Sequence, residues 1–115
     1  MLHGVIIRGT NPEHEFELPY PAATINDVRV IYGQNGKSVL KKTLKLNAEE
    51  CLLTPIDELN SKVIVRLAEN ETYLISASRP LDIEIRVKLN NGKIVRSEDL
   101  ISLRVIDTMD NEVMQ

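Results

Sequence analysis

Aromatic residues are scarce in this chain of 115 residues: they make up 3% of the sequence, and tryptophan is absent. Aromatic side chains are the usual platforms for stacking a base, and they anchor many binding interfaces. Their scarcity therefore argues against a nucleic-acid binder or a small-ligand binder, and favours contacts with protein surfaces. The aromatic residues are Phe16, Tyr20, Tyr32 and Tyr73.

The chain has only one cysteine and no excess of positive charge. Cys51 is the single cysteine, so an intramolecular disulfide and a cluster of thiolate metal ligands are both excluded. Fourteen lysine and arginine residues stand against seventeen aspartate and glutamate residues, and the formal net charge is -3. This balance gives no electrostatic reason to bind nucleic acid or an anionic membrane. We therefore expect neither of them as a partner.

Long apolar runs are missing too. The sequence contains no stretch of about 18 apolar residues, which a membrane-spanning helix requires. The opening MLHGVIIRG has too short an apolar run for a signal peptide, and it has no small-residue cleavage site. We therefore expect a protein that stays in the cytoplasm of the cell that makes it.

Aliphatic residues form most of what is present: ten valines, twelve isoleucines and fourteen leucines, against only five alanines. This ratio favours strands over helices. Apolar residues make up 43% of the chain and charged residues 27%, which is typical of a globular protein. A chain of this length has room for one core. We expect a single β domain over residues 1–106 and a polar C-terminal tail over residues 107–115.

Alternation of apolar and polar residues predicts a series of short strands. Asn35-Gly36 and Asn91-Gly92 each lie between such runs, and asparagine followed by glycine predicts a tight hairpin turn. Residues 55–61 are interpreted as a loop or a single helical turn, and residues 68–73 as one turn of helix. The pattern predicts an antiparallel β-sandwich of the immunoglobulin-like type, or a small barrel, with about eight strands. The expected strands cover residues 5–7, 14–18, 28–32, 38–46, 51–54, 62–67, 81–89, 94–96 and 100–106.

The two predicted hairpins resemble each other. VRVIY at residues 28–32 precedes NGKSV, and IRVKL at residues 85–89 precedes NGKIV, with one extra residue in the first hairpin. Two hairpins built by the same turn rules look alike even without common descent. Both explanations therefore stay open.

Residues that could carry chemistry are few and poorly spaced. His3 and His14 match no metal-ligand motif, and the neighbouring Glu13 and Glu15 lie on the strand face opposite His14. Cys51 has no local signature of a nucleophile, and we interpret it as a buried structural thiol. We predict no catalytic, cofactor or metal site, and therefore no enzyme.

Charged groups on the predicted strands are interpreted as solvated surface. A row of carboxylates lies on one face of a strand, where it also discourages pairing between sheet edges. A small basic cluster is too weak for a nucleic-acid interface. The carboxylates belong to Glu13, Glu15 and Glu17, and the basic cluster is Lys41, Lys42 and Lys45.

Some apolar residues fall where a monomer rarely places them. Ile56 and Leu59 lie in the long middle segment, and three others follow the last predicted strand. Their positions suggest a subunit interface. The residues of the tail are Met109, Val113 and Met114.

The opening of the chain carries a motif. It resembles the R-G-T-x-P-x-H-x-F-x-L-P signature of a group of small structural-type proteins encoded in prophages of low-GC Gram-positive gut bacteria. The likeness continues through most of the chain, and it departs at residues 47–61, which are several residues longer here. The matching residues are Arg8, Gly9, Thr10, Pro12, His14, Phe16 and Leu18.

The resemblance implies a virion structural or tail-region assembly protein without enzymatic activity. Its partners would be further copies of itself or other phage structural proteins, and it would reside in the bacterial cytoplasm or in the virion. Gly9 and Pro12 would shape a turn, and His14 would bond a backbone carbonyl or Thr10. The alternative function is an immunoglobulin-like binding module for a host surface glycan or polypeptide, for which only Tyr20 and Tyr73 are suitably placed.

Overall fold

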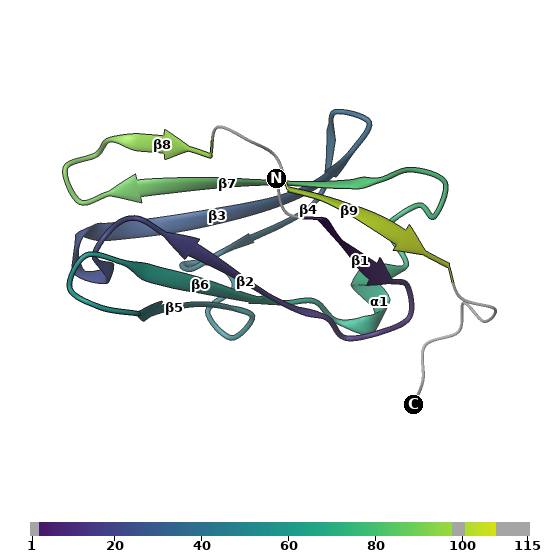
Figure 1. Cartoon of the computed structure of the whole chain (residues 1–115), viewed down its shortest axis with the longest axis horizontal. Coiled ribbons are helices and arrows are strands. Elements are labelled where there is room, and N and C mark those ends of the chain that lie inside the picture. The colour runs from purple at the N-terminus through teal and green to yellow at the C-terminus, as the bar shows by residue number, and fades with distance from the viewer. Residues whose placement is uncertain (1–2, 98–100, 108–115) are drawn as a thin grey trace.

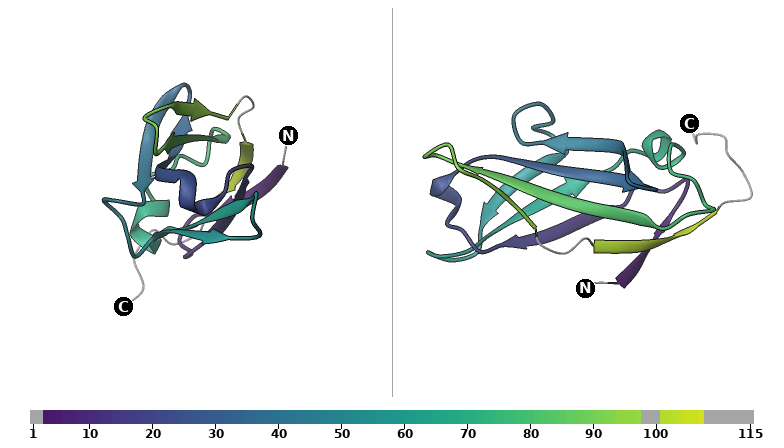
Figure 2. Two further views of the ribbon diagram at one scale, coloured as in Figure 1. Left: turned by 90° about the vertical axis from the view of Figure 1, so that its left-hand side faces the viewer. Right: turned by 90° about the horizontal axis from the view of Figure 1, so that it is seen from above.

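The computed structural model describes residues 3–97 and 101–107, which form two β-sheets packed face to face. Figure 1 shows the strands running along the long axis of the molecule, and the end-on view in Figure 2 shows the two layers. Two short helical segments, η1 (Ala22–Thr24) and α1 (Glu69–Thr72), connect strands. The strands are β1 (His3–Ile7), β2 (Glu13–Leu18), β3 (Ile25–Gln34), β4 (Lys37–Thr43), β5 (Cys51–Pro55), β6 (Ser61–Arg66), β7 (Leu81–Leu89), β8 (Ile94–Arg96) and β9 (Ile101–Ile106).

Within the described residues the larger sheet has six strands, in the order β1-β9-β7-β3-β4 with β8 beside β7. The smaller sheet has three, in the order β2-β6-β5. Neighbouring strands are antiparallel except β1 and β9, which pair in parallel. β8 and β9 pair with opposite ends of β7, along the edge that β3 does not use.

The predicted antiparallel sandwich is therefore confirmed, with one parallel pair as the departure from it. The strands form two separate sheets rather than the alternative barrel in the described part of the chain. The strand order is immunoglobulin-like: β2, β6 and β5 take the places of strands B, E and D, and β9, β7, β3 and β4 those of G, F, C and C′. The inter-sheet disulfide of antibody domains cannot form, because Cys51 is the single cysteine.

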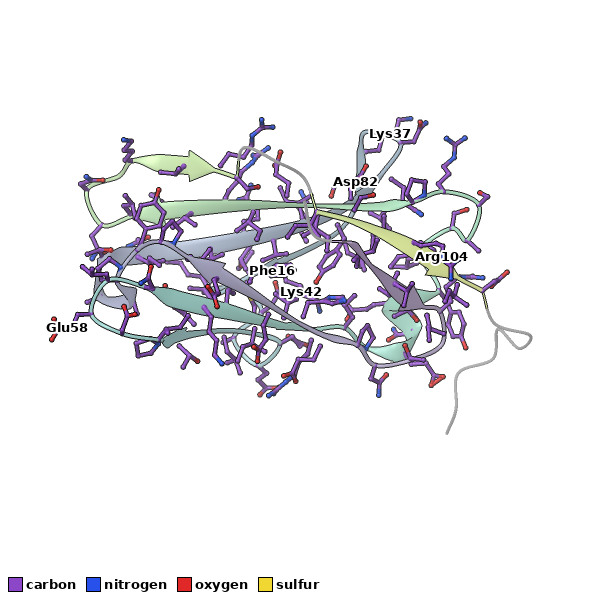
Figure 3. The ribbon with its side chains drawn as sticks, in the orientation of Figure 1. Phe16, Lys37, Lys42, Glu58, Asp82 and Arg104 are labelled. Carbon is purple, nitrogen blue, oxygen red and sulfur yellow. The ribbon has the colours of Figure 1, made fainter. Side chains whose placement is uncertain are left out.

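An aliphatic core fills the space between the sheets. The alternation in β3 and β7 places every second side chain in this core, as predicted. Phe16 contributes the single phenylalanine ring, which Figure 3 shows between the layers. Each buried aliphatic side chain contributes about 1.5–3 kcal/mol, so this packing holds the sheets together without a covalent link. The most deeply buried members include Val28, Val30, Tyr32, Val63, Val65, Leu81 and Ile83.

Both predicted hairpin turns are present, with different geometries. In the β3–β4 hairpin, Asn35 and Gly36 have φ angles of 54° and 75°, the combination that a type I′ turn requires. In the β7–β8 hairpin, Gly92 has a φ of 89° and its N–H donates to the Leu89 carbonyl at 2.9 Å. That geometry is a three-residue loop that ends on a left-handed glycine.

The middle of the chain departs from the predicted strand limits. The strand expected over residues 38–46 ends at Thr43, because residues 44–46 form a turn. Residues 56–60 are the loop of the β5–β6 hairpin, where Asp57 Oδ1 accepts hydrogen bonds from the N–H groups of Leu59 and Asn60, each at 2.8 Å. Of the two structures predicted for this segment, the loop is therefore the one observed. The single helical turn predicted at residues 68–73 is confirmed by α1.

The predicted tail is described only at Asp107, so the division between residues 106 and 107 stays a prediction. Met109, Val113 and Met114 lie outside the described residues. In residues 3–97 and 101–107, no helix combines the length and the apolar character needed to cross a membrane.

Candidate functional site

Arg8 and Gly9, the first residues of the opening motif, form a turn against α1. Gly9 has a φ of 83°, and its N–H donates to Thr72 Oγ1 at 2.8 Å. A Cβ on Gly9 would lie 2.8 Å from the Tyr73 hydroxyl, so this turn requires glycine. The Arg8 guanidinium lies 5.6 Å from the centre of the Tyr73 ring and pairs with Asp107. These contacts attach β1 to α1 and to the end of β9.

The rest of the motif is also used within the fold. Thr10 Oγ1 donates to the Ile7 carbonyl at 2.7 Å, and the Leu67 N–H donates to the Pro12 carbonyl at 3.0 Å. The motif therefore explains how the turn between β1 and β2 is held. The motif residues Phe16 and Leu18 are buried on the inner face of β2.

His14 lies on the same inner face, but its partner differs from the expected one. Its Nδ1 lies 2.8 Å from the hydroxyl of Tyr32 on β3, whereas Thr10 bonds to Ile7. The expected bond to a backbone carbonyl or Thr10 is therefore wrong, because the opposing sheet brings a buried hydroxyl within reach. Burial lowers the pKa of His14 and raises the pKa of Tyr32, so both side chains are neutral at neutral pH. The pair joins the two sheets.

The basic cluster expected at Lys41, Lys42 and Lys45 is not formed. Lys42 points between the sheets, as Figure 3 shows, and is 3% exposed, with its Nζ 2.8 Å from a carboxylate oxygen of Glu71. Lys45 Nζ donates to Asn26 Oδ1 at 2.8 Å. The prediction is wrong because the alternation of β4 sends Lys41 outward and Lys42 inward, while Lys45 lies beyond the strand.

Cys51 is buried, as its interpretation as a structural thiol predicted. Burial raises its pKa to about 11, so the thiol is protonated and unreactive at neutral pH. In the part of the chain that the structure describes, no group of three histidine, cysteine, aspartate or glutamate residues is arranged to hold a metal ion.

The outer face of the smaller sheet carries charges that pair within the protein. The carboxylates of β2 are exposed, as predicted, and they lie opposite β6. Glu13 Oε2 lies 3.0 Å from Nε of Arg66, and Glu15 Oε1 lies 3.7 Å from Nζ of Lys62. Opposite charges on neighbouring strands stabilise a sheet, so Glu13 and Glu15 each have a partner within this face.

The outer face of the larger sheet has the contrary arrangement. Arg29 of β3 lies directly opposite Arg86 of β7, and Arg86 lies opposite Arg96 of β8. Glu84 accepts from Arg86 at 2.8 Å and from Arg96 at 3.0 Å. Among the described residues, the Arg29 side chain has no ion pair or hydrogen bond. Like charges in such a row destabilise a sheet, and within the described residues Glu84 compensates Arg86 and Arg96 but not Arg29.

Two hollows flank this arginine row, and Arg29 and Arg86 line both of them. The larger is about 360 Å³ and the smaller about 130 Å³. A Cβ on Gly33 would lie 2.8 Å from the Lys37 carbonyl oxygen, so the close approach of the β4 backbone requires glycine there and leaves the larger hollow open. Ile31 and Lys41 also line the larger hollow, and Lys88 and Ile94 the smaller.

Figure 3 shows Lys37 and Asp82, which also line the larger hollow, on the side of the larger sheet that faces away from the smaller one. We call the surface formed by the arginine row and the two hollows the cationic face. It is open to solvent, and the partly buried Ile31 and the exposed Ile94 give it an apolar component on each side of the arginines.

The cationic face is not among the sites predicted from the sequence. Alternation alone places Arg29 and Arg86 on outward faces, but it does not say that β3 and β7 are neighbours. The likeness of the two predicted hairpins was the available signal, because it sets both arginines at the same place in similar strands. The interface residues predicted in the middle segment, Ile56 and Leu59, are exposed at the tip of the β5–β6 hairpin.

Comparison with known proteins leaves the family open. No protein-family model matches the sequence, and no curated protein does. Among solved structures, murine CRIg is similar to this chain, with 9% sequence identity and a TM-score of 0.39 over 90% of this chain and 91% of that one. A likeness at this level carries no argument about a ligand or partner. The immunoglobulin-like assignment therefore rests on the strand order.

Proposed function

We propose that the protein is a non-enzymatic structural or assembly component of a phage-type particle and works through protein–protein contacts. The cationic face is the observation that carries this proposal. Its arginines are only partly neutralised within the described chain, and an acidic partner surface would supply the missing carboxylates. Guanidinium groups suit that role, because they bind carboxylates with two parallel hydrogen bonds.

The composition does not explain this concentration of positive charge, since the whole chain is acidic, with a net charge of -3. A row of like charges also lowers the stability of the sheet that carries it. Positions that break such a local rule without benefit to the fold are typical of functional surfaces. The uncompensated charge of Arg29 supports a binding role for the cationic face.

Two interior residues support the non-enzymatic part of the proposal. Histidine and cysteine are the commonest general base and thiol nucleophile, and both must reach the substrate. Here His14 is committed to Tyr32, and Cys51 is buried with a raised pKa. Neither is presented to solvent as a reactive group.

The phage-type part of the proposal is supported by the resemblance of residues 7–19 to the prophage group. The motif residues hold a turn and fill the core. We therefore interpret the motif as a signature of the fold and not of a chemical activity. A phage-type component of this kind would reside in the bacterial cytoplasm or in the virion.

A binding module for a host surface polypeptide is the second candidate, and the immunoglobulin-like strand order favours it. A polypeptide suits this module better than a glycan, because neither candidate tyrosine offers a free ring. Tyr20 packs against the core, and Tyr73 lies beneath the Arg8 guanidinium. Both functions use protein contacts, so they differ in the identity of the partner.

Affinity capture with matched variants tests the proposed function. The full chain, Arg29→Glu and Arg66→Glu are immobilised and exposed to a lysate of the organism that encodes the chain, and bound proteins are identified by mass spectrometry. We expect phage structural proteins or the chain itself on the wild type and on Arg66→Glu, and about tenfold less on Arg29→Glu, since one buried charge contact is worth that much or more.

Two results would contradict the proposal. Identical sets of bound proteins on all three baits would mean that the cationic face is not the contact surface. A bound protein that comes reproducibly from the host surface and not from a phage would favour the second candidate. Arg66→Glu is the matched control, because it makes the same change on the outer face of the smaller sheet.

A further inference from the structure

We infer that the cationic face binds a second copy of the same chain, which inserts the tip of its β5–β6 hairpin. The tip is the loop of residues 56–60, and its sequence is IDELN. The inference rests on the proposed function, since it names the partner of the same face. It makes the protein a self-assembling unit.

The tip carries exposed apolar side chains around an acidic pair. Ile56 is 46% exposed and Leu59 is 71% exposed, on either side of the two carboxylates. Asp57 is committed to the turn, because its Oδ1 accepts hydrogen bonds from backbone N–H groups of the loop. Glu58 is exposed and forms no ion pair within the described residues, and Figure 3 shows it at the extreme end of the molecule.

The cationic face complements this tip in charge and in the order of its apolar residues. Arg29 and Arg86 form the border between two hollows, each of which has an isoleucine among its lining residues. The tip has the corresponding order, with apolar side chains on both sides of its carboxylates. Insertion would place Glu58 against the arginines and the apolar side chains over the hollows. Arg29, which lacks an internal partner, would then gain one.

The same charges argue against a symmetric pair formed by two cationic faces. A two-fold axis through that face would set the arginine row of one copy against the arginine row of the other. Like charges brought together in this way cost several kcal/mol, so a face-to-face dimer is disfavoured. Tip and face are different surfaces, and each copy has one of each. The contact therefore joins unlike surfaces, and its use builds a two-fold dimer with two reciprocal contacts, a larger ring or an open chain.

The contact is small, because a loop of five residues provides one side of it. Stable protein interfaces bury about 1,200–2,000 Å² in total, and a single loop falls short of that area. Assembly should therefore be weak and should increase with protein concentration. It should also weaken as salt is added, because screening reduces attraction between exposed charges.

Mixing two disabled variants tests the inference. Arg29→Glu disables the face and leaves the tip intact, whereas the double variant Glu58→Ala and Leu59→Ala disables the tip and leaves the face intact. Asp57 is kept, so the turn retains its acceptor. Sedimentation velocity on the full chain should show growing oligomers for the wild type, and self-association at least about tenfold weaker for each variant alone. An equimolar mixture of the two variants should form a one-to-one dimer and stop there.

Controls separate this result from a general loss of folding or charge. Arg66→Glu changes the other outer face, and Leu46→Ala removes another exposed leucine, so both should assemble like the wild type. A wild type that is monomeric at every concentration, or a mixture of the two variants that stays monomeric, would overturn the inference. If those results occur while capture of another protein still depends on Arg29, self-association is wrong and the proposed function stands.

Discussion

The outer faces of the two sheets carry their charges in contrary arrangements. On the smaller sheet, Glu13 contacts Arg66 and Glu15 approaches Lys62, so carboxylates of one strand meet cations of the next. On the larger sheet, three strands in succession place arginines side by side. Figure 1 shows the two sheets as the two layers of one sandwich, so the faces differ while the core they cover is shared.

The comparison distinguishes charges that stabilise their sheet from charges that do not. Paired charges on the smaller sheet are self-sufficient, and they also keep an edge strand from pairing with other chains. The arginine row of the larger sheet is only partly neutralised, by Glu84, and an acidic partner would supply further carboxylates. We therefore interpret the smaller sheet as a solvated surface and the larger sheet as a binding surface.

The largest loss of stability is expected at Lys42. Unlike the cations of the two outer faces, Lys42 is buried, and it is paired with Glu71. Glu71→Gln removes the carboxylate that lies 2.8 Å from its ammonium group. An uncompensated buried charge costs about 3–5 kcal/mol, and urea unfolding should show a loss of that size. Adding Lys42→Met to Glu71→Gln should recover most of it. A double variant as unstable as the single one would contradict this assignment.

A smaller loss is expected at the contact that joins the two sheets beneath these faces. His14→Phe leaves the buried hydroxyl of Tyr32 without its partner, which costs about 1–3 kcal/mol. Removing the hydroxyl as well, in the double variant with Tyr32→Phe, should restore much of the free energy of unfolding. If the double variant shows the sum of two independent losses, the hydrogen bond is not what joins the sheets.

The same histidine predicts a pH dependence of stability. Burial lowers the pKa of His14 from 6.5, so the unfolded chain accepts a proton that the folded chain resists. The free energy of unfolding should hold its full value above pH 6.5 and fall as the pH drops from there to the folded-state pKa. Titration of stability in His14→Phe should lack this slope, and a slope that persists would point to another group.

A direct comparison of the two faces uses one carboxylate from each. Glu84→Gln takes away the single acceptor shared by Arg86 and Arg96, and it should cost about 1–2 kcal/mol, because a partly buried, charge-assisted contact is lost. Glu13→Gln removes one exposed pair and should cost about 0.2–1 kcal/mol. Equal losses in urea unfolding would mean that the two faces depend on their carboxylates to the same extent.

Much of the fold could be predicted because alternation reports directly which side of a strand is buried. The strands around Val30 and Ile83 follow this rule, and Gly36 follows the rule for positive φ in tight turns. Alternation does not report which strands are neighbours. The parallel pairing of β1 with β9 and the bond between His14 and Tyr32 both depend on contacts between distant parts of the chain.

The candidate site was harder to predict for the same reason. Arg29 and Arg86 are ordinary outward residues of their own strands, and their opposition exists only once β3 and β7 pair in one register. Lys42 shows the converse error, because its neighbours in sequence suggest a basic surface cluster while the strand turns it inward. Ile56 and Leu59 could be singled out, because two apolar residues fall close together in a segment that reads as a loop.

One charge reversal, made on each of the two faces, should change stability by a small amount and with opposite signs. Arg29→Glu places a carboxylate opposite Arg86, and it should raise the free energy of unfolding by about 0.2–1 kcal/mol. Arg66→Glu places one opposite Glu13 and should lower it by a similar amount. Urea unfolding of both variants beside the wild type, at low salt, is the measurement. A loss of stability in Arg29→Glu as large as that in Arg66→Glu would show that the arginine row serves the fold, and would contradict the account.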